Sequence, residues 1–266
     1  RAKSSLSGFK SFLGKLALGY SFYEMGRGVL TVARDLETMN VQLHTFLRGS
    51  SSASEVFKNI VDYAKGTSYY VKDAMNATIN LMGAGMGPKE AMKLLPKLGD
   101  IASSPEQLGR LSGGYAALYR RGRLSGLELN RFLQGGRFNP LYQLALMQAE
   151  QAGMMTKGQE IEKGSKAEAF VLKAQQALQE SVRKKGVSIA MVDQAIEYAT
   201  SKGGMFFEHQ KNQLNTFAGR WSNMWDNITI NAGLALQKMF PIFKKLFEAG
   251  ANINFDWLER GFTGIA

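Results

Sequence analysis

Residues 83–146, GAGMGPKEAMKLLPKLGDIASSPEQLGRLSGGYAALYRRGRLSGLELNRFLQGGRFNPLYQLAL, decide the fold class of this chain. Helix-start signals recur along them, because proline follows a glycine or a capping side chain at Gly87-Pro88, Ser104-Pro105 and Asn139-Pro140. Proline is favoured at the first helical position, where its missing N–H costs no hydrogen bond. Between these signals, apolar residues fall at helical spacing: Leu94, Leu95 and Leu98; Leu108, Leu111, Tyr115 and Leu118; Leu129, Phe132 and Leu133; Leu141, Leu144 and Ala145. The expected fold class is therefore all-α, a multi-helix module of short amphipathic helices with flanking long helices.

The glycine-rich stretch 83–87 is the part of this module most similar to a ligand site. Free N–H groups and the helix dipole allow a glycine turn before a helix to bind phosphate. A nucleotide site, however, needs a β-strand before the glycines, and a Walker loop also needs Gly-Lys-Ser/Thr at its end. Here a predicted helix precedes the glycines and Pro88-Lys89-Glu90 follows them. We therefore interpret the stretch as a tight turn between two helices.

Three arginines, Arg120, Arg121 and Arg123, form the densest basic group of the module, beside Tyr119. Arginines next to a tyrosine can bind phosphate. Arginines at a helix C-terminus also simply interact favourably with the helix dipole. We favour the dipole interpretation and keep the three arginines as candidate anion contacts.

Longer helices flank the module. Residues 9–47 predict one long helix or two in tandem, whose apolar stripe is a core face, a coiled-coil seam or a membrane-surface face; we favour the core face. Ser52 and Ser68 each predict the start of a helix, and Pro96 predicts a break between helices 89–95 and 97–103. Four regions are expected: an N-terminal amphipathic helix region (1–49), a compact helical module (50–152), a polar linker with a helical pair (153–204) and an aromatic-rich long-helix region (205–266).

The last region concentrates large aromatic side chains on one predicted long helix, or two, over residues 206–247. So many apolar groups on one helix must pack on upstream helices or contact other copies, a tube wall or a membrane. The candidate contacts with a partner or a membrane are Phe217, Trp221, Trp225, Phe240, Phe243 and Phe247.

The chain has 266 residues and a formal net charge of +11, so an anionic partner (nucleic acid, an acidic protein wall or lipid headgroups) and a solvated basic surface are equally open. It has no cysteine, which excludes disulfides and thiolate metal sites, and no apolar run long enough for an ordinary transmembrane helix. The N-terminus lacks a signal-peptide pattern. The chain starts at Arg1 without Met, and we expect it to be a fragment of a longer protein.

Chemistry-bearing patterns are weak. His44 and His209 lie far apart, so we expect no metal site, and no cofactor is indicated. No nucleophile-elbow phrase appears, and Asp193 with Glu197 is more often a solvated helix face than a glycosidase pair. We expect no catalytic residues and no enzyme activity.

Several phrases within residues 83–146 resemble the conserved region of bacteriophage tail tape measure proteins, in order and in spacing. They are Leu98-Gly99-Asp100-Ile101-Ala102, Gly122-Arg123-Leu124, Ser125-Gly126-Leu127-Glu128-Leu129, Gly135-Gly136 and Leu144-Ala145. Gly186-Val187-Ser188 and the Thr216 to Gly219 phrase extend the resemblance, which covers most of residues 36–230. The match is divergent, since the family often carries glutamine where residues 118–120 and 131–132 stand here.

The resemblance implies a structural virion protein that lies in the lumen of the tail tube, sets tail length and is released during genome ejection. Implied partners are other copies of the chain, the tail tube and tail tip proteins, tail assembly chaperones, and the host membrane or the end of the phage DNA. The implied localisation is the virion tail tube interior, and the host cytoplasm during assembly. A ruler gains about 1.5 Å per helical residue, but this chain has many turns, so we expect a folded docking or delivery module. The alternatives are a membrane-active helical module, such as a pore or channel for DNA delivery, and a basic nucleic-acid-binding helical protein.

Overall fold

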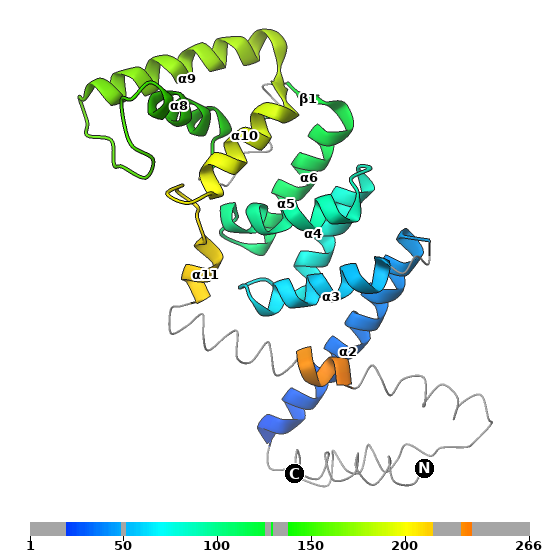
Figure 1. The fold of residues 1–266 in the computed structure, drawn as a ribbon. Coiled ribbons are helices and arrows are strands. Elements are labelled where there is room, and N and C mark those ends of the chain that lie inside the picture. Colours follow the sequence, from blue (N-terminus) through cyan, green and yellow to red (C-terminus); the bar gives the residue numbers. More distant parts are fainter. Residues whose placement is uncertain (1–19, 49–51, 126–128, 130–137, 215–229, 236–266) are drawn as a thin grey trace, which may run out of the picture. The chain divides into compact units, whose positions relative to one another are not determined.

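The computed structural model describes residues 20–48, 52–125, 129, 138–214 and 230–235 (Figure 1). The chain divides into two compact units, of which one combines residues 1–42 with 224–266 and the other spans Leu43–Asn223. The described residues are helical apart from turns and one pair of two-residue strands, so the all-α prediction is confirmed. The predicted regions 1–49, 50–152, 153–204 and 205–266 stay a prediction.

The core of the larger unit forms around α4 (Val71–Gly83), which packs against α3 (Ser52–Lys65), α5 (Pro88–Ile101) and α6 (Pro105–Arg121). Each helix places its apolar stripe inward, as the helical spacing predicts. The largest fully buried side chains of these four helices are Ile60, Met75, Leu81, Leu95, Leu98, Leu108 and Leu118. Residues 84–87 form the turn between α4 and α5, as interpreted from the glycines.

Side-chain caps start α6 and α8 (Pro140–Gln151). The Ser104 hydroxyl accepts a hydrogen bond from the Gln107 N–H, and the Asn139 side chain accepts from the backbone N–H groups of Leu141 and Tyr142. Ser68 is different, because α4 begins three residues after it at Val71, and the carboxylate of Asp73 accepts from the Tyr70 N–H. The predicted cap at Ser68 is therefore wrong, and its hydroxyl serves a long-range contact instead.

Pro96 does not divide α5. The sequence predicts two helices meeting at this residue, whereas the structure has one helix from Pro88 to Ile101 with the proline inside it. The ring of Pro96 lies on the exposed side of the helix. A carbonyl left without its N–H partner on that side can bond water instead, which lowers the cost of an internal proline.

A second layer of the larger unit consists of α8 (Pro140–Gln151), α9 (Lys166–Lys185) and α10 (Ile189–Thr200), with α8 in contact with both other helices (Figure 1). The apolar side of α9 faces α8: Val171 is buried, and Phe170, Ala174 and Leu178 pack against the same apolar cluster. Ser188 caps α10 by accepting from the Met191 N–H.

The last described helix of this unit, α11 (His209–Leu214), packs against α5 through a buried glutamine. The amide nitrogen of Gln210 donates to Tyr69 Oη, to the Gly99 carbonyl at 3.1 Å and to the Ala102 carbonyl at 3.3 Å. Its amide oxygen accepts from the Ser68 hydroxyl at 2.7 Å. We call this set of bonds the Gln210 network. It joins residues that lie more than a hundred positions apart in the sequence.

The long helix predicted from Phe206 begins only at His209. Phe206 lies in a turn, buried edge-to-face against Phe138 with 6.2 Å between ring centroids. A large aromatic ring needs such burial more than it needs a helical backbone. The rest of the predicted aromatic helix lies outside the described residues, except for the helical residues 230–235.

The helix α2 (Tyr20–Phe46) belongs to the smaller unit as far as Gln42, and it carries the apolar stripe predicted for the second half of residues 9–47, with Leu36 and Met39 buried. Gly233, in the helical residues 230–235, lies against Val32, Ala33 and Leu36, where an added Cβ would be only 3.0 Å from a methyl of Val32. The predicted core face is therefore used for helix–helix packing.

Candidate functional site

The six aromatic residues predicted to contact a partner or a membrane lie outside the described residues. They are Phe217, Trp221, Trp225, Phe240, Phe243 and Phe247. Among the helices that the structure describes, none is both long and apolar enough to cross a membrane.

The three candidate anion contacts lie together at the end of α6. Arg120 and Arg121 occupy its last turn and Arg123 begins the short strand β1 (Arg123–Leu124), with all three side chains exposed. The structure thus places the three predicted arginines together on the surface, at the C-terminal end of α6.

β1 pairs with a second short strand, β2 (Val187–Ser188), which directly follows α9. The pairing is antiparallel, with Arg123 opposite Ser188 and Leu124 opposite Val187. One further backbone bond, from the Ile189 N–H to the Gly122 carbonyl at 3.3 Å, extends the junction. This strand pair holds the C-terminal ends of α6 and α9 side by side.

Two glycines make the junction possible. Gly122 ends α6 in the left-handed conformation, with φ of 74° and ψ of −18°. Gly186 ends α9 with φ of 73° and ψ of 173°, a region that is essentially restricted to glycine. An added Cβ on Gly186 would lie 2.7 Å from the Leu124 carbonyl oxygen. Any other residue at 186 would therefore push β1 away from β2.

The junction adds three further cations to the predicted arginines. Arg183, Lys184 and Lys185 form the last turn of α9, and all three are exposed. We call the resulting set the basic cluster: Arg120, Arg121, Arg123, Arg183, Lys184 and Lys185. Sequence reasoning missed its second half, although three consecutive basic residues before a glycine are visible in the sequence, because no local pattern pairs residue 123 with residue 188.

One hydrogen bond links the two halves of the basic cluster. Arg123 Nη1 donates to the backbone carbonyl of Lys185 at 3.3 Å. A cation at a helix C-terminus interacts favourably with the negative end of the dipole. Arg123 thus interacts with the C-terminal end of α9, whereas the helix-dipole interpretation from the sequence concerned the end of α6.

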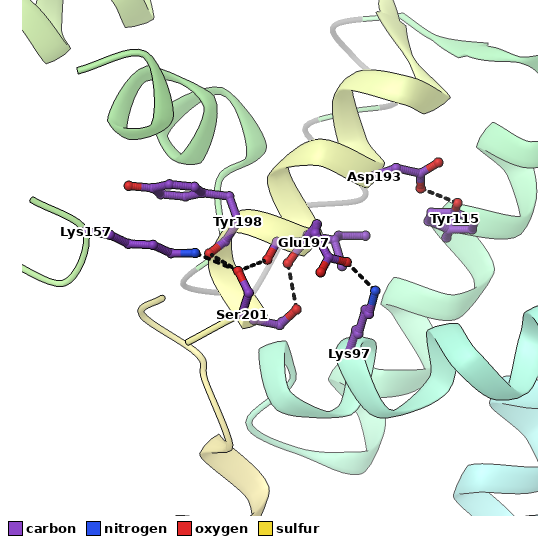
Figure 2. Close-up of polar contacts among 9 residues, drawn as sticks. Lys97, Tyr115, Lys157, Asp193, Glu197, Tyr198 and Ser201 are labelled. Atoms are coloured by element: carbon purple, nitrogen blue, oxygen red, sulfur yellow. Dashed lines mark hydrogen bonds and ion pairs between the residues drawn. The ribbon is translucent and has the colours of Figure 1, made fainter. Parts of the chain in front are cut away.

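Two acidic residues of the neighbouring α10 are engaged with other helices, as Figure 2 shows. The Asp193 carboxylate accepts a hydrogen bond from the Tyr115 hydroxyl of α6, and Glu197 forms an ion pair with Lys97 of α5. Burial raises the pKa of Tyr115, and its hydrogen bond to Asp193 raises it further, so the phenol stays a donor at neutral pH. These contacts fix α10, and with it β2, against the core.

The structure also has a cavity of about 430 Å³ between α8, the loop after it and the end of α10, lined in part by Tyr142, Leu146, Ile161 and Tyr198. Lys157 lies at its wall, but its ammonium is 4.4 Å from the centre of the Tyr198 ring and donates to the Ser201 hydroxyl at 2.6 Å (Figure 2). The amide nitrogen of Gln143 is buried there without a hydrogen-bond acceptor among the described residues.

Both histidines are in contact with residues of their own neighbourhood. His44 Nε2 lies 3.3 Å from Ser54 Oγ, and His209 Nε2 lies 3.0 Å from Gln213 Nε2. Within the part of the chain that the structure describes, no group of His, Asp and Glu side chains is arranged to hold a metal ion.

Comparisons with known proteins give no relative: no family model, no curated protein and no solved structure matches this chain.

Proposed function

We propose that this chain is a structural component of a bacteriophage tail, related to tape measure proteins, and that it acts as a folded docking or delivery module. The supporting observation is the agreement between the family-like phrases and the helix ends. The phrase Leu98 to Ala102 covers the end of α5, and Gly122-Arg123-Leu124 covers the end of α6 and β1. Gly186-Val187-Ser188 covers the junction between α9 and α10. Phrases that recur at turns are more specific than apolar positions, because a turn tolerates fewer residue types.

A module rather than a measuring rod is favoured by the turns themselves. A chain of 266 residues as one helix would extend roughly 400 Å at 1.5 Å per residue. Instead, the chain turns at residues 84–87 and 102–104, and α3, α5 and α6 all pack on α4. Folded helices of this length contribute little to the length of a tube.

In this proposal the chain resides in the lumen of the tail tube and is in the host cytoplasm during assembly. Its partners are other copies of itself, the tail tube and tail tip proteins and the tail assembly chaperones. The host membrane and the end of the phage DNA are contacts during ejection. The role is one of binding and assembly, without catalysis.

The decisive experiment combines an in-frame deletion with tail measurement. In the phage that encodes the chain, residues 52–214 are deleted and tail lengths are measured by electron microscopy. A rod would shorten the tail by roughly 240 Å at 1.5 Å per residue. A folded module predicts tails of nearly unchanged length that fail to assemble fully or fail to deliver DNA.

Mass spectrometry of purified virions provides the control for this experiment. The proposal requires peptides from the chain in the intact virion and their loss after DNA ejection. Virions without these peptides, or a tail shortened in proportion to the deletion, would contradict the proposal.

The two alternatives differ in what supports them. The membrane-active alternative depends on aromatic residues outside the described part of the chain. The nucleic-acid-binding alternative has one observation in its favour, the basic cluster at the ends of α6 and α9.

A further inference from the structure

We propose that the basic cluster binds double-stranded nucleic acid through its phosphate backbone, without reading the base sequence. This inference does not depend on the phage-tail proposal, since it rests on the geometry of the junction between β1 and β2 alone.

The charge of the cluster exceeds what the helix ends require. Each helix C-terminus carries roughly half a negative charge, so the two ends together offset about one of the six positive charges. The two stretches that form the cluster, residues 119–125 and 181–188, contain no Asp or Glu. The junction therefore brings six exposed cations together, and they form a local positive field.

The cluster is also held in a fixed geometry before any ligand arrives. The strand register places Arg123 opposite Ser188, and the Arg123 guanidinium is already bonded to the Lys185 carbonyl. A guanidinium has five N–H donors, so this bond leaves it able to make a bidentate phosphate contact. A preorganised set of donors loses less conformational entropy on binding than free side chains do.

The residue types in the cluster favour a double helix over a single strand. Neither stretch contains Asn or Gln, the amide side chains that read adenine edges. The one aromatic side chain, Tyr119, is half-buried and its hydroxyl donates to Glu90 at 3.3 Å, so it is a poor platform for stacking an unpaired base. Contacts would therefore be with phosphates, which position a duplex but do not specify its sequence.

The apolar residues of the two stretches argue against a lipid surface as the partner. Leu124, Val182 and Val187 are all buried. A peripheral membrane contact normally inserts exposed apolar side chains beside its cations, and stable anchoring needs that second component. An array of cations without such side chains is suited to phosphates in water.

The test uses two variants of equal charge. The cluster variant carries Arg120→Gln, Lys184→Gln and Lys185→Gln, and the control variant carries Arg110→Gln, Lys58→Gln and Lys72→Gln, three exposed cations on α6, α3 and α4. Each removes one Arg and two Lys, so both have a net charge of 11 − 3 = +8. Binding of two unrelated fluorescent duplexes is measured by anisotropy over a series of NaCl concentrations, with circular dichroism to verify that each variant is folded.

We expect the unaltered chain to bind both duplexes with similar affinity and with a linear decrease of log K against log [salt]. The cluster variant should lose roughly tenfold or more in affinity, and its salt slope should decrease by up to about 2.7, which is about 0.9 for each of three lost phosphate contacts. The control variant should retain most of the affinity and the slope.

Three results would overturn the proposal. Equal losses in the cluster and control variants would mean that net charge alone attracts the nucleic acid. Tighter binding of single strands than of duplexes would contradict the argument from Tyr119. Absence of duplex binding would contradict the site itself; if vesicles of phosphatidylglycerol and phosphatidylcholine then bound the unaltered chain but not the cluster variant, the partner would be an anionic membrane.

Discussion

Gln210 and Arg123 both hold together parts of the chain that are distant in sequence, but they do so under opposite conditions. Gln210 is only 3% exposed, and each end of its amide is hydrogen-bonded to protein groups. Arg123 lies in water, beside five other cations and no carboxylate from its own two stretches. The Gln210 amide is fully hydrogen-bonded within the fold, whereas the basic cluster carries an excess of positive charge.

The difference separates folding from binding. A buried polar group must be paired, because leaving it unpaired costs about 1–3 kcal/mol. The contribution of the Gln210 network to the stability of the fold is therefore enough to explain it. The basic cluster is only partly explained in this way: the helix dipoles and the bond from Arg123 to the Lys185 carbonyl stabilise some of its charge, but exposed like charges also repel each other. We propose that the cluster serves a partner.

The largest expected effect is the loss of the Gln210 network. Replacing Gln210 by leucine leaves the Gly99 and Ala102 carbonyls, the Ser68 hydroxyl and Tyr69 Oη without this partner. We expect the free energy of unfolding to fall by about 3 kcal/mol, measured by guanidinium denaturation. Gln176→Leu on the exposed side of α9 is the matched control and should change it by less than about 0.5 kcal/mol. Equal effects of the two substitutions would mean that the network does not stabilise the fold.

The next effect tests the junction that positions the basic cluster. Gly186→Ala places a methyl group 2.7 Å from the Leu124 oxygen in a conformation restricted to glycine. We expect a loss of about 2 kcal/mol in unfolding free energy and weaker duplex binding, although all six cations remain. Gly109→Ala in α6, where a Cβ meets nothing within 4 Å, is the control and should stabilise by up to about 1 kcal/mol. Unchanged duplex binding by a folded Gly186→Ala variant would show that the strand pair does not position the cations.

Two neighbouring tyrosines, Tyr63 and Tyr69, provide a third and smaller test. Their rings stack with 6.3 Å between centroids, but their hydroxyls differ in hydrogen bonding. Tyr69 Oη lies 2.9 Å from the Gly99 carbonyl and 2.8 Å from the Ala102 carbonyl, whereas Tyr63 Oη is buried without a hydrogen-bond partner among the described residues. Tyr69→Phe should therefore lower the free energy of unfolding by about 1–2 kcal/mol, and Tyr63→Phe should leave it unchanged or raise it slightly. The reverse order in thermal denaturation would contradict the assignment.

These sites also show which parts of the molecule could be predicted from the sequence. The caps at Ser104, Asn139 and Ser188 were predictable because each bond spans at most three residues. Ser68 was misassigned as a cap because its actual partner, Gln210, lies 142 positions away. Local chemistry in the sequence determines where helices start, but it contains no information on contacts made through the fold.

The candidate site follows the same rule. Its first half, Arg120 to Arg123, was predictable as a dense basic group near a helix end. The second half was not, because β1 and β2 have two residues each, too short for any alternating pattern. Only the pairing of Arg123 with Ser188 makes one site from two basic segments.

A fourth test uses the pH dependence of Asp100, whose carboxylate accepts from the Gln210 N–H at 3.0 Å. Burial raises the pKa of Asp100 above its ordinary value near 3.8, although the bond from Gln210 opposes this shift. At pH values between the ordinary pKa of the unfolded chain and the raised pKa of the folded chain, the folded chain binds more protons than the unfolded chain. The free energy of unfolding therefore decreases as pH rises through that window.

The measurement for this test compares denaturation curves of the unaltered chain and of Asp100→Asn from acidic to neutral pH. The stability of the unaltered chain relative to the variant should increase as the pH falls through the raised pKa and should become constant below 3.8. A relative stability that increases with pH would mean that the pKa of Asp100 is lowered in the folded chain, because the hydrogen bond from the Gln210 backbone N–H has a larger effect on it than burial.

The smallest expected effect is the most informative about the basic cluster. The variant with Arg120→Gln, Lys184→Gln and Lys185→Gln loses favourable interactions with two helix dipoles, at about 0.3–1 kcal/mol each, and is relieved of like-charge repulsion of similar size. The two contributions have opposite signs, so we expect the free energy of unfolding to change by less than about 0.5 kcal/mol in guanidinium denaturation. A loss of 2 kcal/mol or more would mean that the cations stabilise the junction itself, as the Gln210 network stabilises the core. A change near zero, together with lost duplex binding, would mean that these charges serve a partner and not the fold.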